Sequence, residues 1–393
     1  MHNICFHFQI SQPYRLRTYR FFDINQHHNY FDDYQNNYLA KRLAERCYLP
    51  ANAMLMNLME KYGNRIRVSF SIAGSSLKIF EEYCPEVIES FRKLFATGNV
   101  EITGNTYTHS IASLYNQRCF ADQIHLQEKY LAELFGIRPT SFCNTGIIYS
   151  DEIGEWLHNA GYNVILTEGA RHILGWKSPC YLYCNPFQTD VRLLLRSYQL
   201  CDDIALRFTD KDYDNMGLTA GKYIAKLEKL PEDAPFINLF FDYETIGEYY
   251  TGDTGIFDFF KALFSQLAES RDYRFILPRE VSRMEVSTST MHAPWPISYS
   301  GDEKDTAEWL GNDLQQEAFN QLFKLEDLYF QSGNETAKLN WLRLQAADHF
   351  NFMNTKWLEY NAVHRNFAVY PSPYQAFINY MNVLNDVKLQ LEQ

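Results

Sequence analysis

The stretch "FINLFFDYETIGEYY", residues Phe236–Tyr250, joins an apolar strand to an acidic turn. Five of its first six residues are apolar, which predicts a strand buried in a parallel sheet. Asp242 follows directly, and Glu244 and Glu248 come after it, so three carboxylates lie within seven residues. Partial desolvation and neighbouring carboxylates raise the pKa of a carboxyl group at such a strand end, which suits Asp242 to hold a proton as a general acid. The alternative interpretation is a helix N-cap that opens a solvated acidic turn.

Similar apolar runs alternate with amphipathic helical patterns through most of the chain. Strands are predicted at Ile4–Gln9, Val68–Ala73, Val100–Thr103, Ser141–Asn144, Asn163–Thr167, Val191–Arg196, Phe236–Phe241 and Tyr273–Leu277. Helices are predicted at Tyr38–Lys61, Leu77–Ala96, Ala121–Phe135, Asp151–Ala160, Gly221–Lys229 and Phe257–Glu269. This alternation predicts an α/β fold with a parallel sheet, and the number of units favours a closed or nearly closed barrel over an open sheet.

The character of the chain changes near residue 290. The segment "VSTSTMHAPWPISYS", residues 286–300, lacks periodicity and predicts a linker or crossing loop. Beyond it, residues 302–334, 336–356 and 374–391 show helical patterns. We therefore expect two domains, a barrel over residues 1–289 and an α-helical domain over residues 290–393.

Composition excludes several classes of partner. The formal charge of -12 and a pI near 5.4 argue against a nucleic-acid partner, because phosphate binding needs a basic surface. No apolar run approaches the roughly 18 residues that a membrane span requires. The first residues lack the charged and small-residue features of a signal peptide, so a cytoplasmic location is expected. The eight cysteines form no metal-binding spacing, and we expect buried free thiols and no metal.

In a barrel, the chemistry gathers at the C-terminal ends of the strands, so the residues there are candidates for a site. Ser11 and Gln12 follow the first strand in "QISQPYRLR". Glu101 lies within the third strand and needs a partner, either a structural ion pair or a ligand in the site. His109 follows that strand in "GNTYTHS" and is either a hydrogen-bonding partner for a substrate hydroxyl or a packed core histidine.

Five segments, in this order along the chain, together carry a specific resemblance. They are "FQISQPYRLR" at 8–17, "GNVEITGNTYTHS" at 98–110, "FCNTGIIYSDEIGEWLHNAGYNVILTEG" at 142–169, "FFDYETIGEYY" at 240–250, and "AADHFNFMNTKW" at 346–357, which "EWLGND" at 308–313 precedes. With these segments, the chain resembles glycoside hydrolase family 57, in particular its α-amylase-like branch. The resemblance implies an incomplete (β/α)7 barrel followed by a helical C-terminal domain.

The resemblance also implies an activity and a set of site residues. The family uses a retaining mechanism on α-glucans, with a glutamate nucleophile and an aspartate acid/base, and it implies an α-glucan or maltooligosaccharide ligand and no cofactor. Asp242 matches the acid/base by its place in the motif. The residues that lie in the matching segments and are expected to bind substrate are Ser11, Gln12, Glu101, His109, Tyr243, Glu244, Trp309, His349, Lys356 and Trp357.

Some of these residues have a second interpretation. Trp309 and Trp357 either stack on sugar rings or seal the interface between the two domains. His349 and Lys356 are seven residues apart on a predicted helix, so they either share one face toward the barrel mouth or form an ordinary solvated pair.

The chain departs from the family at the most consequential position. The nucleophile follows the pair Asn144-Thr145, and here that residue is Gly146, which has no oxygen to attack a sugar. Ser11 replaces the histidine of a His-Gln-Pro motif, and Asn105 stands where this branch has glutamate. The carboxylates that could substitute for the nucleophile are Glu152, Glu168 and Glu101, of which Glu168 is the best placed by topology.

Several functions follow from these residues. The first is a pseudoenzyme that binds α-glucans and hydrolyses them slowly or not at all. The second is an active retaining hydrolase or 4-α-glucanotransferase that uses Asp242 and a substitute carboxylate. The third is a non-catalytic structural or regulatory protein. A metal-dependent polysaccharide deacetylase is disfavoured because the His-x-x-x-His spacing is absent. No oligomeric state follows from the sequence.

Overall fold

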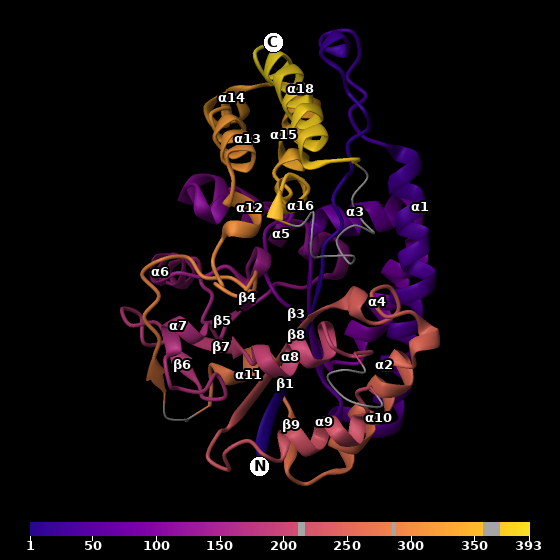
Figure 1. Ribbon diagram of the computed structural model, residues 1–393, viewed down its shortest axis with the longest axis vertical. Coiled ribbons are helices and arrows are strands. Elements are labelled where there is room, and N and C mark those ends of the chain that lie inside the picture. Colours follow the sequence, from indigo (N-terminus) through magenta and orange to yellow (C-terminus); the bar gives the residue numbers. More distant parts are fainter. Residues whose placement is uncertain (211–216, 285–287, 357–369) are drawn as a thin grey trace.

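The computed structural model describes residues 1–210, 217–284, 288–356 and 370–393. Within these ranges, seven parallel strands follow one another around a barrel in the order β1-β2-β3-β4-β5-β7-β8 (Figure 1). Their bounds are β1 His2–Ile10, β2 Val68–Ile72, β3 Val100–Ile102, β4 Ser141–Cys143, β5 Val164–Glu168, β7 Arg192–Arg196 and β8 Phe236–Asp242. Three short strands lie beside them, β6 Tyr183–Cys184, β9 Tyr273–Phe275 and β10 Ser289–Thr290. The predicted incomplete (β/α)7 barrel is confirmed.

The barrel consists of two five-stranded sheets that meet at two weak joins. At the first join, the amide of Gly104 after β3 donates to Ser141 O at 2.8 Å, and Cys143 N donates back to Gly104 O at 2.9 Å. At the second, Ser197 N after β7 donates to Asn238 O of β8 at 2.9 Å. These joins are short compared with the seven-residue register between β1 and β8, and they make the barrel incomplete.

Side chains on the strands alternate between the barrel interior and the surrounding helices, as the period of two requires. On β1, Phe8 faces outward and packs against Phe260 of helix α10 at 6.4 Å between ring centroids. His7 faces the interior, where its Nδ1 lies 2.9 Å from Ser69 Oγ of β2. Apolar interior residues such as Leu194 and Phe240 fill the barrel below the C-terminal ends of the strands.

Helices surround the barrel (Figure 1). They are α1 Asp33–Leu43, α2 Leu49–Tyr62, α3 Gly74–Tyr83, α4 Pro85–Ala96, α5 Gln117–Phe135, α6 Asp151–Asn159, α7 Arg171–Leu174, α8 Tyr198–Ala205, α9 Ala220–Leu227, α10 Ile256–Glu269 and α11 Pro278–Val281. Two predicted helices are each interrupted. A π-helical turn over Ala44–Tyr48 separates α1 from α2, and the residues that flank it, Leu43 and Leu49, keep helical backbone angles. Pro85 begins α4, because the residue before a proline avoids the helical conformation, and Cys84 has φ of -152° and ψ of 66°.

The C-terminal part is helical, as predicted, but its helices are shorter. They are α12 Ala307–Leu310, α13 Asp313–Phe323, α14 Glu326–Gln331, α15 Glu335–Leu344, α16 Ala347–Asn351 and α18 Pro373–Leu391. Figure 1 shows them in orange and yellow above the barrel, at the end opposite the N-terminus. The helix predicted over residues 302–334 is three helices, α12, α13 and α14. The side chain of Asn312 caps α13 by accepting from Gln315 N at 3.0 Å, which separates α13 from α12. No helix in the described ranges is long and apolar enough to cross a membrane.

The domain boundary near residue 290 stays a prediction. Strand β10 pairs with β6, and Ile297 bridges to Tyr149, so the connecting segment runs along the barrel before it enters the helices. All eight cysteines are buried and free, which confirms the expectation of unpaired thiols.

An N-terminal arm between β1 and α1 lies beside the C-terminal helix α18 (Figure 1). A buried carboxylate of that helix is one of the groups that anchor the arm. Asp386 of α18 accepts hydrogen bonds from Tyr19 Oη at 2.7 Å, Tyr30 Oη at 2.8 Å and the backbone N of Asn25 at 2.8 Å. His28 Nδ1 lies 2.8 Å from the same carboxylate. Although burial opposes it, hydrogen bonding from these partners holds the pKa of Asp386 below its ordinary value.

Replacing Asp386 by asparagine is expected to lower the free energy of unfolding by about 3 kcal/mol, because the new amide hydrogens face donors. Urea denaturation at neutral pH measures the loss. Glu392→Gln is the matched control, since Glu392 lies just beyond the same helix with its side chain 43% exposed. Equal stabilities of the two variants would contradict the role assigned to Asp386.

Candidate active site

Two adjoining cavities open at the C-terminal ends of the strands, between the barrel and the C-terminal helices. The smaller, about 80 Å³ and here called the small chamber, is lined by Gln9, Ser11, Gln12, Arg15, His109, Asp242, Glu244, Tyr249, Tyr299, Glu308, Trp309, Ala347, Asp348, Asn351 and Phe352. The larger, about 500 Å³ and here called the wide chamber, includes Ile147, Arg196, Phe240, Ser300 and Lys304. Five residues line both chambers, namely Gln9, Asp242, Tyr249, Tyr299 and Glu308.

The position of Asp242 follows from the pairing of β1 with β8. In that register Gln9 is opposite Asp242, and both are the last inward-facing residues of their strands. The next residue, Tyr243, turns away from the chambers and is fully buried behind the sheet. Its ring lies 5.0 Å from that of Phe8, and its hydroxyl donates to Asn52 Oδ1 at 2.8 Å. The predicted contact of Tyr243 with sugar does not fit this placement.

Glu244 returns to the small chamber and is held by a chain of hydrogen bonds. Gln12 Nε2 donates to its carboxylate at 3.1 Å, and Tyr48 Oη donates to it at 2.6 Å. Arg15 Nη2 in turn donates to Gln12 Oε1 at 2.9 Å. Burial, with the nearby charge of Asp242, raises the pKa of Glu244 to about 8 against these hydrogen bonds. Near neutral pH, the carboxyl group of Glu244 in the small chamber is therefore protonated or shares a proton with a neighbouring group.

His109 and Ser11 complete the polar wall contributed by the barrel. His109 adopts a left-handed backbone conformation with φ of 55°, which turns its ring toward Gln9, where Nδ1 lies 3.5 Å from Nε2. Burial lowers the pKa of His109 to about 4, so the imidazole is neutral at neutral pH. Among the described residues, none hydrogen-bonds the buried hydroxyl of Ser11. Both side chains can therefore exchange hydrogen bonds with a neutral polar ligand.

Gly146 lies in a tight turn after β4 whose geometry only glycine adopts easily. Its φ is 56°, and its carbonyl accepts from Tyr299 N at 3.2 Å. A Cβ at this position would lie 2.2 Å from Cη2 of Trp309, the tip of the indole. The ring of Trp309 is 2% exposed and is packed against Tyr299 at 6.1 Å between centroids. Trp309 therefore fills the space into which a nucleophilic side chain would project.

Glu308, next to Trp309, is an acidic residue of the site that sequence reasoning missed. It is 3% exposed, lines both chambers together with Asp242, and accepts a hydrogen bond from Asn351 Nδ2. Burial raises its pKa to about 7, while hydrogen bonding from Ser300 and Asn351 lowers it. In the described part of the chain no lysine, arginine or histidine forms an ion pair with it.

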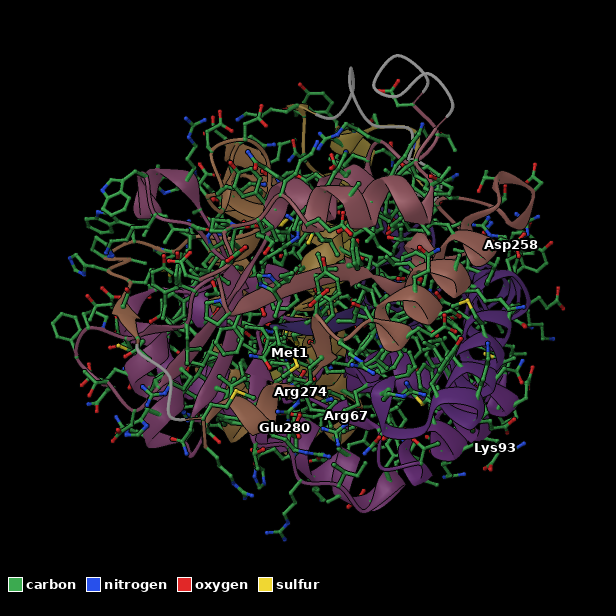
Figure 2. All side chains as sticks on the ribbon, turned by 90° about the horizontal axis from the view of Figure 1, so that it is seen from below. Met1, Arg67, Lys93, Asp258, Arg274 and Glu280 are labelled. Carbon is green, nitrogen blue, oxygen red and sulfur yellow. The ribbon has the colours of Figure 1, made fainter. Side chains whose placement is uncertain are left out.

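The carboxylates predicted as substitutes for the nucleophile are all engaged or directed elsewhere. Glu168 is fully buried, pairs with Arg196 Nη1 at 3.2 Å and lines neither chamber. Glu152 is exposed on α6. Glu101 accepts from the backbone N of Arg279 at 2.9 Å. Arg279 adjoins Glu280, which Figure 2 shows beside Arg67 on the underside of the barrel, so Glu101 faces away from both chambers.

In the C-terminal segment, the residues that line the site are sequence neighbours of the predicted ones, not the predicted ones themselves. His349 is buried among the helices, with its ring 5.7 Å from that of Tyr380, and does not line either chamber. Instead Asp348 and Asn351, on the other side of the short helix α16, line the small chamber. Lys356 is exposed and lines neither chamber, and Trp357 lies outside the described residues. Because α16 is so short, residue spacing alone could not show which of its faces meets the barrel.

The structure thus gathers Ser11, Gln12, His109, Asp242, Glu244 and Trp309 and adds residues that were not predicted. The added polar residues of the small chamber are Gln9, Arg15, Tyr249, Tyr299, Glu308, Asp348 and Asn351. Glu308 and Asp348 each lie beside a predicted residue, so the matching segments were the signal that could have found them. Over the described ranges, no group of three or more His, Cys, Asp or Glu side chains could hold a metal ion.

The chain belongs to glycosyl hydrolase family 57, whose sequence model matches residues 5–294. A relative from Methanocaldococcus jannaschii named "Putative alpha-amylase" is 33% identical over 406 aligned positions, which cover 99% of this chain and 85% of the relative.

Solved structures share the fold at low sequence identity. The α-amylase AmyC from Thermotoga maritima is 14% identical, with a TM-score of 0.63 over 100% of this chain and 92% of that one. A family 57 branching enzyme from Pyrococcus horikoshii is 12% identical, with a TM-score of 0.69 over 100% of this chain and 94% of that one. The likeness therefore covers the C-terminal helices as well as the barrel.

Substituting Gly146 by alanine is expected to destabilise the protein by about 2–3 kcal/mol, because the new Cβ overlaps the Trp309 ring and the left-handed φ disfavours it. Chemical denaturation measures the cost. In a double-mutant cycle with Trp309→Leu, the coupling should exceed about 1 kcal/mol. Gly333→Ala, at an open position, is the neutral control. Additive effects of the two substitutions would show that Trp309 does not fill this space.

Burial lowers the pKa of His349 to about 4, so acid should destabilise the helical region. As the pH falls below about 6.5, the unfolded chain binds this proton first, and stability is lost until the folded-state pKa is reached. Between pH 7 and pH 5, His349→Phe should lose about 2 kcal/mol less than the unsubstituted protein. Urea denaturation at both pH values tests this difference, and parallel losses would exclude His349 as the acid-sensitive group.

Proposed function

We propose that this protein binds an α-glucan or maltooligosaccharide in the two chambers and hydrolyses it weakly or not at all. The observation that carries the proposal is the combination of an intact polar chamber around Asp242 with an indole packed onto Gly146. A retaining glycosidase needs two carboxyl groups about 5 Å apart, one of which forms the covalent bond to the sugar. The motif places that nucleophile at Gly146, where Trp309 leaves no room for one.

Binding is supported by the chemistry of the chamber walls. Sugar hydroxyls are neutral donors and acceptors, and the small chamber offers amide, hydroxyl and neutral imidazole groups from Gln9, Ser11 and His109. The wide chamber adds the rings of Tyr249, Tyr299 and Phe240, and aromatic faces suit the apolar faces of glucose rings. Its volume of about 500 Å³ lies in the range of cavities that take small ligands. A short oligosaccharide is therefore a better match than a long polymer segment.

Calorimetric titration with maltose, maltotriose and maltohexaose tests this function, alongside long incubations in which products are followed by chromatography. We expect saturable binding with slow or undetectable turnover. Asp242→Asn should abolish any turnover, while Glu152→Gln, an exposed carboxylate on α6, should change neither quantity. If none of the three sugars binds, the remaining explanation is that the protein has a structural or regulatory function. Turnover at rates typical of the enzyme class, about 1–1000 per second, would establish the active alternative.

Restoring the nucleophile requires removal of the indole. Gly146→Glu alone should misfold or stay inactive, because its Cβ meets Trp309 at 2.2 Å. Combined with Trp309→Gly, the new carboxylate gains space, and we expect turnover to rise by about 10²-fold over the parent protein, with retained α-anomer products. Product anomers are followed by proton nuclear magnetic resonance, and Trp309→Gly alone is the control. A folded, sugar-binding double variant with the parent's rate would count against Gly146 as the vacant nucleophile position.

A further inference from the structure

A cluster of arginines lies at the underside of the barrel, the end opposite the two chambers. Because the barrel strands are parallel, the residues that precede them gather at this end. Arg67 directly precedes β2, whereas Thr140 and Asn163 directly precede β4 and β5. Arg274 lies in β9, which pairs in parallel with the first residues of β1. Figure 2 shows Arg67 and Arg274 near the middle of this underside, beside Glu280.

Two adjoining cavities open within the cluster. The larger underside cavity has a volume of about 770 Å³, and the smaller underside cavity has a volume of about 400 Å³. Arg274 lines both cavities, and Arg67 Nη1 in the smaller one lies 2.6 Å from Glu280 Oε1 in the larger one. Among the described lining residues, Glu280 is the only carboxylate. The arginines that line the two cavities are Arg65, Arg67, Arg271, Arg274, Arg279 and Arg283.

Within the described ranges, carboxylates of the chain neutralise little of this positive charge. No ion pair joins Arg274, Arg279 or Arg283 to a carboxylate of the described residues. Glu280 is already engaged in the ion pair with Arg67. The chain as a whole has a formal charge of -12, so the cluster is a basic site on an acidic protein. Like charges held close together repel one another, and an anion bound among them removes that repulsion.

The lining side chains favour a phosphate group attached to a hydroxyl-bearing body. A guanidinium group is charged throughout the neutral pH range, and its fork of N–H donors matches two oxygens of one phosphate. Thr140, Asn163 and Ser282 are exposed in the larger underside cavity, where their hydroxyl and amide groups suit the hydroxyls of a sugar. No aromatic residue is among the described residues of this cavity, so a nucleobase finds no ring there on which to stack. The volume of about 770 Å³ is that of a small-ligand site.

We propose that the underside cavities form a binding site for a phosphorylated monosaccharide. Arg274, at the junction of the two cavities, donates hydrogen bonds to the phosphate oxygens together with Arg279 and Arg283. Thr140 and Asn163 exchange hydrogen bonds with the sugar hydroxyls in the larger underside cavity. None of the described residues that line this site lines either chamber, so binding here does not depend on the proposed binding of α-glucans.

Calorimetric titration of the full chain with glucose 6-phosphate tests the site, with excess maltotriose present to occupy the chambers. We expect saturable binding of one equivalent. Arg274→Gln should weaken this binding by about 10–100-fold, because a charged hydrogen-bond donor is lost. Arg274→Lys keeps the charge but loses the fork of donors, so its loss should be smaller, about 3–10-fold. A rise in KCl from about 0.05 M to about 0.5 M should weaken binding by about tenfold, since salt screens exposed charges.

The matched control is Arg118→Gln, which removes an arginine whose side chain is 52% exposed beside the C-terminal helices, with its Nη1 3.0 Å from Asp327 Oδ1. This variant should bind glucose 6-phosphate as the parent protein does. Circular dichroism verifies the folding of every variant. If Arg274→Gln does not fold, Arg283→Gln, at an exposed position of the larger underside cavity, takes its place and should weaken binding by about tenfold.

Two further probes separate the phosphate from the body that carries it. Inorganic phosphate has no sugar and adenosine monophosphate carries a base, so each should bind about tenfold or more weakly than glucose 6-phosphate. Equal or tighter binding of either probe would overturn the assignment of a phosphorylated sugar. The site itself would be overturned if none of the three probes bound saturably, or if Arg118→Gln and Arg274→Gln lost affinity equally. Maltotriose binding is measured on the same samples, so its failure counts against the proposed function and not against this site.

Discussion

The pairing of β8 with β1 is the constraint on which the site depends. Seven consecutive residue pairs fix the register between the two strands, from Asn3 with Phe236 to Gln9 with Asp242. Because side chains alternate along a strand, a shift of one residue would turn Asp242 into the helical layer and bring Tyr243 into the chamber. Aromatic packing on the outer face prevents this shift, since Tyr243 is enclosed by the rings of Phe8 and Phe70. The hydrophobic core outside the barrel thus determines which residue faces the ligand inside it.

A second contact decides the chemistry of the site, the packing of Trp309 on Gly146. Glycine at this position permits both the left-handed turn and the close approach of the indole, and neither is open to glutamate without rearrangement. The substitution and the tryptophan therefore form one structural unit that joins the barrel to the C-terminal helices. A larger side chain introduced at position 146 alone would therefore meet the indole of Trp309.

Local patterns predicted the barrel and its strand ends well. The alternation of apolar strands and amphipathic helices located each barrel strand to within a few residues. Pro85 marks the break between α3 and α4, which a periodic pattern alone overlooks. In the C-terminal part, short helices that bury different faces gave no consistent period, so the side of α16 that meets the barrel could not be assigned from spacing.

The site residues that were predicted follow barrel strands, whereas those that were missed lie in loops and short helices. Those that follow a strand directly, such as Asp242 and Gln12, were found because topology places strand ends together. Glu308 and Asp348 come from loops and short helices whose position depends on contacts between distant segments, and only the folded chain shows which neighbour points inward. Glu101 was misplaced for a related reason: a buried carboxylate needs a partner, and here the backbone of Arg279 supplies it.

The two weak joins of the barrel divide the site between two sheets. Asp242 belongs to the sheet of β1, β2, β3 and β8, whereas the Gly146 turn follows β4 of the other sheet. Few hydrogen bonds tie one sheet to the other, so a small change in the tilt between them alters the gap across the chambers while each sheet keeps its own ladder intact. The distance between Asp242 and the Gly146 turn therefore depends on the angle between the two sheets, and it can change in evolution without any change in the strands themselves.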